Sequence, residues 1–134
     1  MTVRVPYNTG FAPPAPVVPV RIALSSGDDA VMLPMLIDTG ADETLVPVAI
    51  VRQLGLPPID VVAVIGIHGG RRRGVMHAAD LSIGDFRIAA RVVAFSHEAI
   101  LGRNVLNQLV MILDGPASMI SVRRPARPRR RAGR

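Results

Sequence analysis

Twelve glycines and twelve prolines divide this 134-residue chain into short runs rich in valine, isoleucine and leucine. Glycine and proline interrupt helices, whereas β-branched residues favour strands. The length suits one domain with a single modest core. Because aromatic residues make up only 3% of the sequence, that core must be built from aliphatic side chains. We therefore predict an all-β domain of short strands with one or two short helices.

Strands and hairpins are expected where apolar runs flank turn residues, namely over 17–26, 30–38, 61–78, 80–95, 99–106 and 110–122. Segment 30–38 is continuously apolar, which is typical of a strand buried on both faces, although Pro34 favours an edge position or a bulge. Residues 47–55 begin with proline and end with glycine, which predicts a short helix. A second short helical segment is expected at "NVLNQL", after a Gly-Arg corner.

The formal net charge of +6 arises at one end of the chain. Residues 123–134 contain seven of the sixteen basic residues, and the other nine are nearly balanced by ten acidic residues. A proline-broken arginine run predicts a disordered tail. It could bind nucleic acid electrostatically, but no aromatic residue is interleaved for base stacking, so a solvated tail is favoured. We divide the chain into a Pro-rich, poorly ordered arm (1–16), a folded domain (17–122) and this tail.

Several classes of function lack the residues they need. There is no cysteine, and the three histidines, His68, His77 and His97, do not have metal-site spacing. We therefore expect no metal and no other cofactor. The N-terminal segment is broken by prolines and has no uninterrupted apolar stretch typical of a secretory signal, and no run of about twenty apolar residues predicts a membrane span. A cytoplasmic protein without membrane contact is expected.

The most apolar segment of the chain ends in an acid, in "MLPMLIDTGADETLVP". Burying a lone carboxylate is costly unless it is paired, hydrogen-bonded or neutralised. Two carboxylates that face each other can share one proton, because like charges about 3 Å apart cannot both ionise. Such a pair can activate water to hydrolyse an amide. By itself Asp-Thr-Gly is a weak signal, because an aspartate in a turn can also cap neighbouring amides.

The wider context strengthens the motif. "LIDTGADETLVP", then the glycine-rich "IGIHGG", and then "ILGRNVL" just over sixty residues after Asp38 together resemble the retroviral-type aspartic proteases (retropepsins), most of all their small bacterial relatives. The resemblance covers roughly 17–122. It implies a closed β-barrel of the acid-protease type. It also implies a homodimer that cleaves peptide or protein substrates with a water activated between two copies of Asp38.

The resemblance also implies roles for individual residues. Asp38, Thr39 and Gly40 match the catalytic triplet, with the Thr39 hydroxyl reaching the other subunit and the Gly40 carbonyl contacting substrate. Asp42 matches an acid that binds substrate backbone and forms an ion pair with Arg103. The flap residues that would contact substrate are Ile67, His68 and Gly69. Gly102, with the preceding apolar pair Ile100 and Leu101, matches the segment that packs behind the catalytic loop.

Two features depart from the viral pattern. Arginines 71–73 lie beside the flap, where they could favour acidic substrates, although arginines that simply point to solvent are favoured. The hairpin expected at 110–122 makes the segment after "ILGRNVL" longer than in viral enzymes, so the dimer interface can differ. The alternative to a protease is a catalytically silent peptide-binding or assembly module with the same fold. The intact Asp-Thr-Gly, Asp42 and Arg103 argue against it.

Overall fold

The computed structural model describes residues 2–24, 29–65, 69–95 and 97–126. Within these ranges the chain forms short strands and two short helices, which confirms the prediction of a mostly β protein. In chain order the elements are β1 (Thr2–Pro6), β2 (Val17–Ala23), β3 (Ala30–Ile37), β4 (Thr44–Val46), α1 (Val48–Leu54), β5 (Pro58–Ile65), β6 (Arg71–Ile83), β7 (Phe86–Ala94), β8 (Ile100–Leu101), α2 (Arg103–Leu106), β9 (Val110–Asp114) and β10 (Met119–Arg123).

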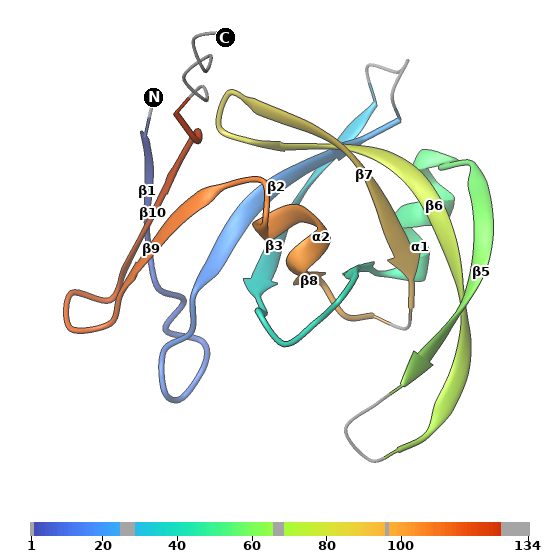
Figure 1. The fold of residues 1–134 in the computed structure, drawn as a ribbon, viewed down its shortest axis with the longest axis horizontal. Coiled ribbons are helices and arrows are strands. Elements are labelled where there is room, and N and C mark those ends of the chain that lie inside the picture. The colour runs from blue at the N-terminus through green and yellow to red at the C-terminus, as the bar shows by residue number, and fades with distance from the viewer. Residues whose placement is uncertain (1, 25–28, 66–68, 96, 127–134) are drawn as a thin grey trace, which may run out of the picture.

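The strands form two sheets. A seven-stranded sheet has the order β2-β3-β8-β4-β7-β6-β5, and β2 also pairs with β6, so that this sheet curls back on itself. A three-stranded sheet has the order β1-β10-β9. Figure 1 shows the small sheet on one side of the molecule and the β5–β6 hairpin on the opposite side. Most neighbouring strands run antiparallel, but β3 pairs with β8, and β4 with β7, in parallel.

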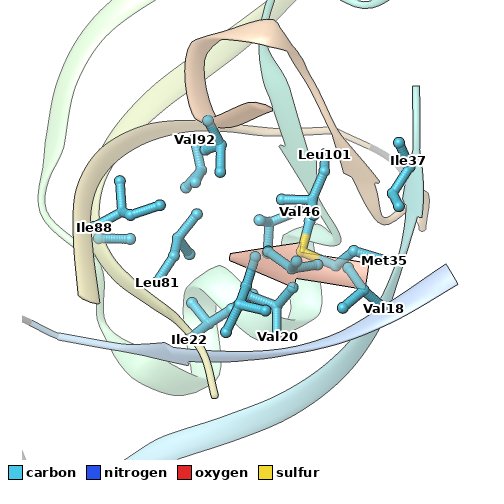
Figure 2. Close-up of a cluster of buried hydrophobic side chains, with 14 of the residues drawn as sticks. Val18, Val20, Ile22, Met35, Ile37, Val46, Leu81, Ile88, Val92 and Leu101 are labelled. Carbon is cyan, nitrogen blue, oxygen red and sulfur yellow. The ribbon is translucent and has the colours of Figure 1, made fainter. Parts of the chain in front are cut away.

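The core is aliphatic, as the composition requires. Side chains from β2, β3, β4, β6, β7 and β8 meet inside the curled sheet (Figure 2), and Val18, Met35 and Leu101 among them are completely buried. Each fully buried side chain of this size contributes about 1.5–3 kcal/mol through removal of apolar surface from water. The core also includes Ile120 of β10 and Val122, which join the small sheet to the large one.

Strand β3 corrects one expectation. Residues 30–38 were predicted to be buried on both faces, but burial alternates along β3, and Met32 is 60% exposed. Only one face packs on the core, and a uniformly apolar sequence conceals this alternation. An edge position or a bulge was expected at Pro34. Strand β3 lies between β2 and β8, but β8 pairs only with Leu36 and Ile37, so Pro34 has a paired residue only in β2, namely Pro19.

The N-terminal arm is a second correction. Residues 1–16 were expected to be poorly ordered, but Thr2–Pro6 forms β1, which pairs with β10 along its whole length. Val3 and Val5 pack against the core, and this burial explains why the strand is ordered.

The first residues of the predicted C-terminal tail are ordered as well. Arg123 belongs to β10, and the Arg124 guanidinium lies 4.6 Å from the centre of the Phe86 ring, so these two arginines are part of the folded structure. Residues 127–134 of the predicted disordered tail lie outside the described residues, and nucleic-acid binding by the tail stays a prediction.

The local predictions agree well with the structure. The helix expected over 47–55 is α1, with Pro47 at its N-cap and Gly55 in the left-handed region (φ 62°), which glycine adopts readily at a helix end. The hairpins expected at 61–78 and 110–122 are β5–β6 and β9–β10. One difference is that β6 continues to Ile83, so the strand expected after residue 80 is the end of a longer one. No helix of the described residues is long and apolar enough to cross a membrane.

Candidate active site

The segment after β3 contains the Asp-Thr-Gly triplet, and its position is set by β8. The backbone N–H of Asp38 donates to the Leu101 carbonyl oxygen at 3.1 Å, which extends the parallel β3–β8 pairing by one residue. Leu101 is completely buried, as the sequence predicted for the segment behind this loop. Asp38 itself is only half-buried, because it is the first residue beyond the buried part of β3. The costly burial of a lone carboxylate is therefore avoided in the single chain.

The Asp38 carboxylate has one hydrogen bond within its own loop. The backbone N–H of Gly40 donates to Asp38 Oδ1 at 2.9 Å. A Cβ atom at Gly40 would lie 3.2 Å from the same oxygen, so this position favours a residue without a side chain. The bond fits an aspartate that caps a turn, and it equally fits a carboxylate held at a fixed angle for chemistry. The surroundings of the loop decide between a turn-capping aspartate and a catalytic one.

Arg103 holds the loop from the opposite side, as the resemblance implied. Its Nη1 donates to the Thr39 carbonyl oxygen at 2.8 Å, and its Nη2 forms an ion pair with Asp42 Oδ1. Its backbone N–H also donates to the Ala41 carbonyl oxygen at 2.8 Å. In the single chain 44% of the Arg103 side chain and 83% of the Asp42 side chain are exposed, so this pair lies at the surface. The guanidinium therefore clamps the loop at the surface.

A buried hydroxyl under the loop was missed by the sequence analysis. Thr44 is the one buried polar residue found among the described residues. Its Oγ1 donates to Asn104 Oδ1 at 2.8 Å and accepts the backbone N–H of Gly102 at 3.1 Å. The Asn104 amide in turn donates to the Arg91 carbonyl oxygen at 2.8 Å, which connects the loop to β7. Thr44 and Asn104 lie inside the two recognised motifs, "LIDTGADETLVP" and "ILGRNVL", but nothing in the sequence indicates that their side chains meet.

Gly102 is required by a close backbone approach. A Cβ atom there would lie 2.2 Å from the carbonyl oxygen of Glu43 and 3.0 Å from the backbone nitrogen of Thr44. These are backbone atoms, which cannot move aside as the end of a side chain can. The backbone at Gly102 is extended (φ −92°, ψ 177°), so the requirement is steric and does not arise from an unusual conformation.

A cleft of about 390 Å³ separates the loop from the β5–β6 hairpin. Figure 1 shows the β3–β4 connection and the C-terminal end of β5 in the lower half of the view. One wall is the loop from Gly40 to Glu43, and the other is the stretch of β5 from Val62 to Ile65. Leu45 and Val93 complete the lining, so an apolar surface lies beside a polar loop. This combination is typical of sites that bind small molecules or extended peptides.

The structure brings most of the predicted residues together at this loop. Asp38, Thr39, Gly40 and Asp42 lie on it, and Gly102 and Arg103 contact it. The predicted substrate-binding residues Ile67 and His68 lie outside the described residues, so their contacts stay a prediction. Gly69 is exposed with φ 76°, a conformation that suits a glycine at a hairpin turn.

The acids of the described ranges do not form a metal site. In these ranges no group of three or more His, Cys, Asp or Glu side chains could hold a metal ion. The expectation that the protein uses no metal or other cofactor stays a prediction.

The comparisons with known proteins agree with this arrangement. The family described as "gag-polyprotein putative aspartyl protease" matches residues 28–108, which is more than half of the chain. The solved structure of EIAV protease complexed with the inhibitor HBY-793 is similar in fold, with a TM-score of 0.55 and 25% sequence identity. The match covers 77% of this chain and 92% of the EIAV protease chain. No curated protein matches the sequence.

Proposed function

The chain belongs to the retropepsin-like family of gag-type aspartyl proteases, and from this premise we propose that it is an aspartic endopeptidase that acts as a homodimer. The observation that carries the proposal is the position of Asp38. Its carboxylate lies half-buried on a loop that is fixed by β8 and by Arg103, and the next residues of that loop form one wall of an apolar cleft. A turn cap alone would not need this support from segments about sixty residues away.

The proposed chemistry uses two copies of Asp38 that share one proton. One carboxylate takes a proton from a water molecule while the other donates a proton to the carbonyl oxygen of the substrate. The water attacks the carbonyl carbon, and the amide is cleaved without a covalent intermediate. An extended substrate would lie in the cleft and form strand-like hydrogen bonds to the loop and to the hairpin, which we assign as the flap.

The second Asp38 must come from another chain. Asp-Thr-Gly occurs once in the sequence, and the other acids for which the structure gives contacts have partners of their own, with Asp42 paired to Arg103. Asp60 accepts the backbone N–H of Val61, Asp80 forms an ion pair with Arg87, and Asp114 accepts the backbone N–H of Ala117. A two-fold axis would pass between the two Asp38 carboxylates, so each subunit would offer the same surface to the other.

The edge strand β9 is our candidate for a further part of that surface. It is one of the two outer strands of the small sheet, and Ile112 and Leu113 on it are 53% and 45% exposed. Adjacent residues of a strand point to opposite faces, so β9 exposes apolar side chains on both faces. An exposed apolar edge strand favours pairing with another chain. We further propose that the large sheet is the closed barrel of the acid-protease type, supported by the β2–β6 pairing.

The test is the digestion of a mixed peptide library by wild-type protein and by Asp38→Asn. Asparagine keeps the size and the hydrogen bond to Gly40 but cannot take a proton from water, so we expect cleavage to be abolished while the fold is retained. Wild-type cleavage should be inhibited by a transition-state mimic such as pepstatin. Cleavage by Asp38→Asn at a near wild-type rate would contradict the assignment.

A dilution series tests the shared site. Below the dimer dissociation constant the rate should fall with the square of protein concentration, and above it the rate should be linear. Excess Asp38→Asn subunits should inhibit the wild-type protein, because mixed dimers contain only one ionisable member of the pair. Constant specific activity under conditions where sedimentation detects only monomer would rule out a site shared between chains.

The second candidate function is a catalytically silent module that binds peptides with the same cleft. The half-exposed Asp38 with its local cap is the observation in its favour. Such a module would bind library peptides equally well as wild type and as Asp38→Asn, and neither protein would cleave them.

A further inference from the structure

Three consecutive arginines at the start of β6 have no role in the function proposed above. Arg71, Arg72 and Arg73 are all exposed, and among the described residues none of their side chains has an ion pair or a hydrogen-bond partner. Because these arginines lie on a strand, the direction of each side chain can be inferred from its position. Alternate residues of a strand point to opposite faces, so the three guanidinium groups cannot all be directed to the same surroundings.

The register of the hairpin sorts the three arginines by face. Gly74 pairs with Val62, and a Cβ atom at Gly74 would lie 2.6 Å from Cγ1 of the buried Val93. The face of the hairpin that contains Gly74 and Val62 is therefore the inner face, which lines the cleft. Arg72 lies two residues from Gly74 and pairs with Val64, so it is on this same inner face.

The other two arginines are on the outer face. Arg71 pairs with Ile65 and Arg73 pairs with Ala63, and all four residues are exposed. Val61 and Val75, which pair with each other on this face, are exposed as well. Arg73 is therefore a neighbour of Arg72 with the same charge, on the same strand and on the opposite face of the hairpin.

The two walls of the cleft differ in charge, and Arg72 lies beside the apolar one. Asp42 and Glu43 are in the loop wall of the cleft, and Asp42 is already paired with Arg103. The hairpin wall next to Arg72 is apolar, because Val62, Ala63, Val64 and Ile65 line it. A peptide lying between the two walls would direct alternate side chains toward the loop and toward the hairpin. A side chain directed toward the hairpin near Arg72 meets an unpaired guanidinium at the border of an apolar wall.

We propose that Arg72 is a specificity-determining residue that selects peptides with Asp or Glu near the scissile bond, on the side of the substrate that faces the hairpin. Guanidinium and carboxylate groups match in planar, bidentate geometry, and the apolar wall reduces competition from water. Arg71 and Arg73 contribute no such preference, because they are on the other face. The proposal rests on the endopeptidase function proposed above and names its class of substrate.

The experiment compares the wild-type protein with Arg72→Gln, Arg72→Glu and the matched controls Arg73→Gln and Arg73→Glu. Each digests the same library of randomised peptides, and cleavage sites are read by mass spectrometry, with Asp38→Asn as the blank. A pair of peptides that differ only by Glu or Gln at the preferred position then gives kcat/KM ratios.

We expect wild-type cleavage sites to be enriched in Asp or Glu at one position. The Glu-over-Gln ratio of kcat/KM should fall about tenfold or more in Arg72→Gln, since a hydrogen bond to a charged group is lost. Arg72→Glu should prefer Lys or Arg at that position, and both Arg73 variants should behave as wild type. The wild-type preference should also decrease as salt is raised, because part of the interaction is screened.

The outcomes separate this inference from the function on which it rests. Cleavage by the wild type with no acidic preference, or with a preference that Arg72→Gln retains, would overturn the role of Arg72 and leave the endopeptidase assignment intact. An equal loss in the Arg73 variants would show a general charge effect and would also overturn it. Absence of any wild-type cleavage above the Asp38→Asn blank would overturn the endopeptidase function itself, and this inference with it.

Discussion

The loop from Asp38 to Glu43 and the β5–β6 hairpin form the two walls of one cleft, yet they are supported in opposite ways. The loop is short: it donates a hydrogen bond to β8, and it accepts hydrogen bonds from the Arg103 guanidinium and from the first two backbone N–H groups of α2. The hairpin extends from the large sheet with one face exposed, and its inner face contacts buried Val93 at Gly74. Substitutions at the buried contacts of the loop should therefore cost the most stability, whereas substitutions at exposed positions of the hairpin should change which ligands bind.

This difference follows from general physical reasons. Catalytic groups must be held within a narrow geometry by residues that are themselves fixed by packing and hydrogen bonds. Regions with few buried contacts open and adjust more readily, and ligand-binding segments are often drawn from them. Four substitutions, ordered from the largest expected effect to the smallest, test whether the two walls differ in this way. Because a dimer is proposed, the variants must be compared at equal protein concentration.

Gly102→Ala should be the most destabilising change. The new Cβ atom would lie 2.2 Å from the Glu43 carbonyl oxygen, so the loop and β8 must separate. We expect a loss of about 3 kcal/mol in the free energy of unfolding, at the upper end of the usual cost of overpacking. Urea unfolding monitored by circular dichroism measures this loss.

The matched control is Gly70→Ala, in the hairpin. No atom lies within 4 Å of a Cβ atom at Gly70, so unfolding should change by less than about 0.5 kcal/mol. Equal losses in the two variants would show that the loop is no more tightly packed than the hairpin.

Thr44→Val should be the second largest change. Valine keeps the shape of threonine but removes the hydroxyl that bridges the Gly102 N–H and Asn104 Oδ1. Leaving these two groups without a partner should cost about 1–3 kcal/mol. Thr44→Ser, which keeps the hydroxyl and loses only a methyl group, is the control. If Thr44→Val is as stable as the wild type, the buried hydroxyl does not support the loop.

The sequence was sufficient for the features that depend on local patterns. The hairpins were predictable because their turn residues and apolar runs are adjacent in the chain, and α1 was predictable from Pro47 and Gly55. The alternation of burial along β3 was not, because nearly every residue of that strand is apolar on both faces. The order of β1 was missed because its partner, β10, lies at the other end of the chain.

In the candidate site, too, some features could be predicted from the sequence and others needed the structure. The Asp42–Arg103 pair was predicted from the family resemblance, but its exposure was not, because exposure depends on what covers the two side chains. The role of Thr44 depends on contacts with Gly102 and Asn104, about sixty residues away, for which the sequence offers no local signal. Arg72 could be assigned to the inner face of the hairpin only from the β5–β6 register. Residues joined by long-range contacts therefore needed the structure.

Gly74→Ala tests the one inner position of the hairpin that is tightly packed. Its Cβ atom would lie 2.6 Å from Val93 Cγ1, which is a side-chain atom and can move more easily than backbone. We expect a loss of about 1–2 kcal/mol in the free energy of unfolding, smaller than that of Gly102→Ala. Peptide cleavage should fall further than stability alone explains, since the two walls of the cleft would separate. Gly74→Ala with Val93→Ala should restore the fit, and failure to do so would contradict the contact.

Arg103→Ala should have the smallest effect on stability, although its contacts with the loop are the most numerous of the four. The ion pair with Asp42 is exposed to water, and exposed pairs contribute about 0–1 kcal/mol. A pair buried in the protein would instead cost about 3–5 kcal/mol when one partner is removed. Removal of the guanidinium also frees the Thr39 carbonyl, so activity should fall more than stability does.

Arg103→Lys, which keeps the charge but not the forked donors, should recover stability and only part of the activity. A loss of several kcal/mol for Arg103→Ala, present at high protein concentration and absent in dilute monomer, would show that the partner subunit buries this pair and makes the loop rigid only in the dimer.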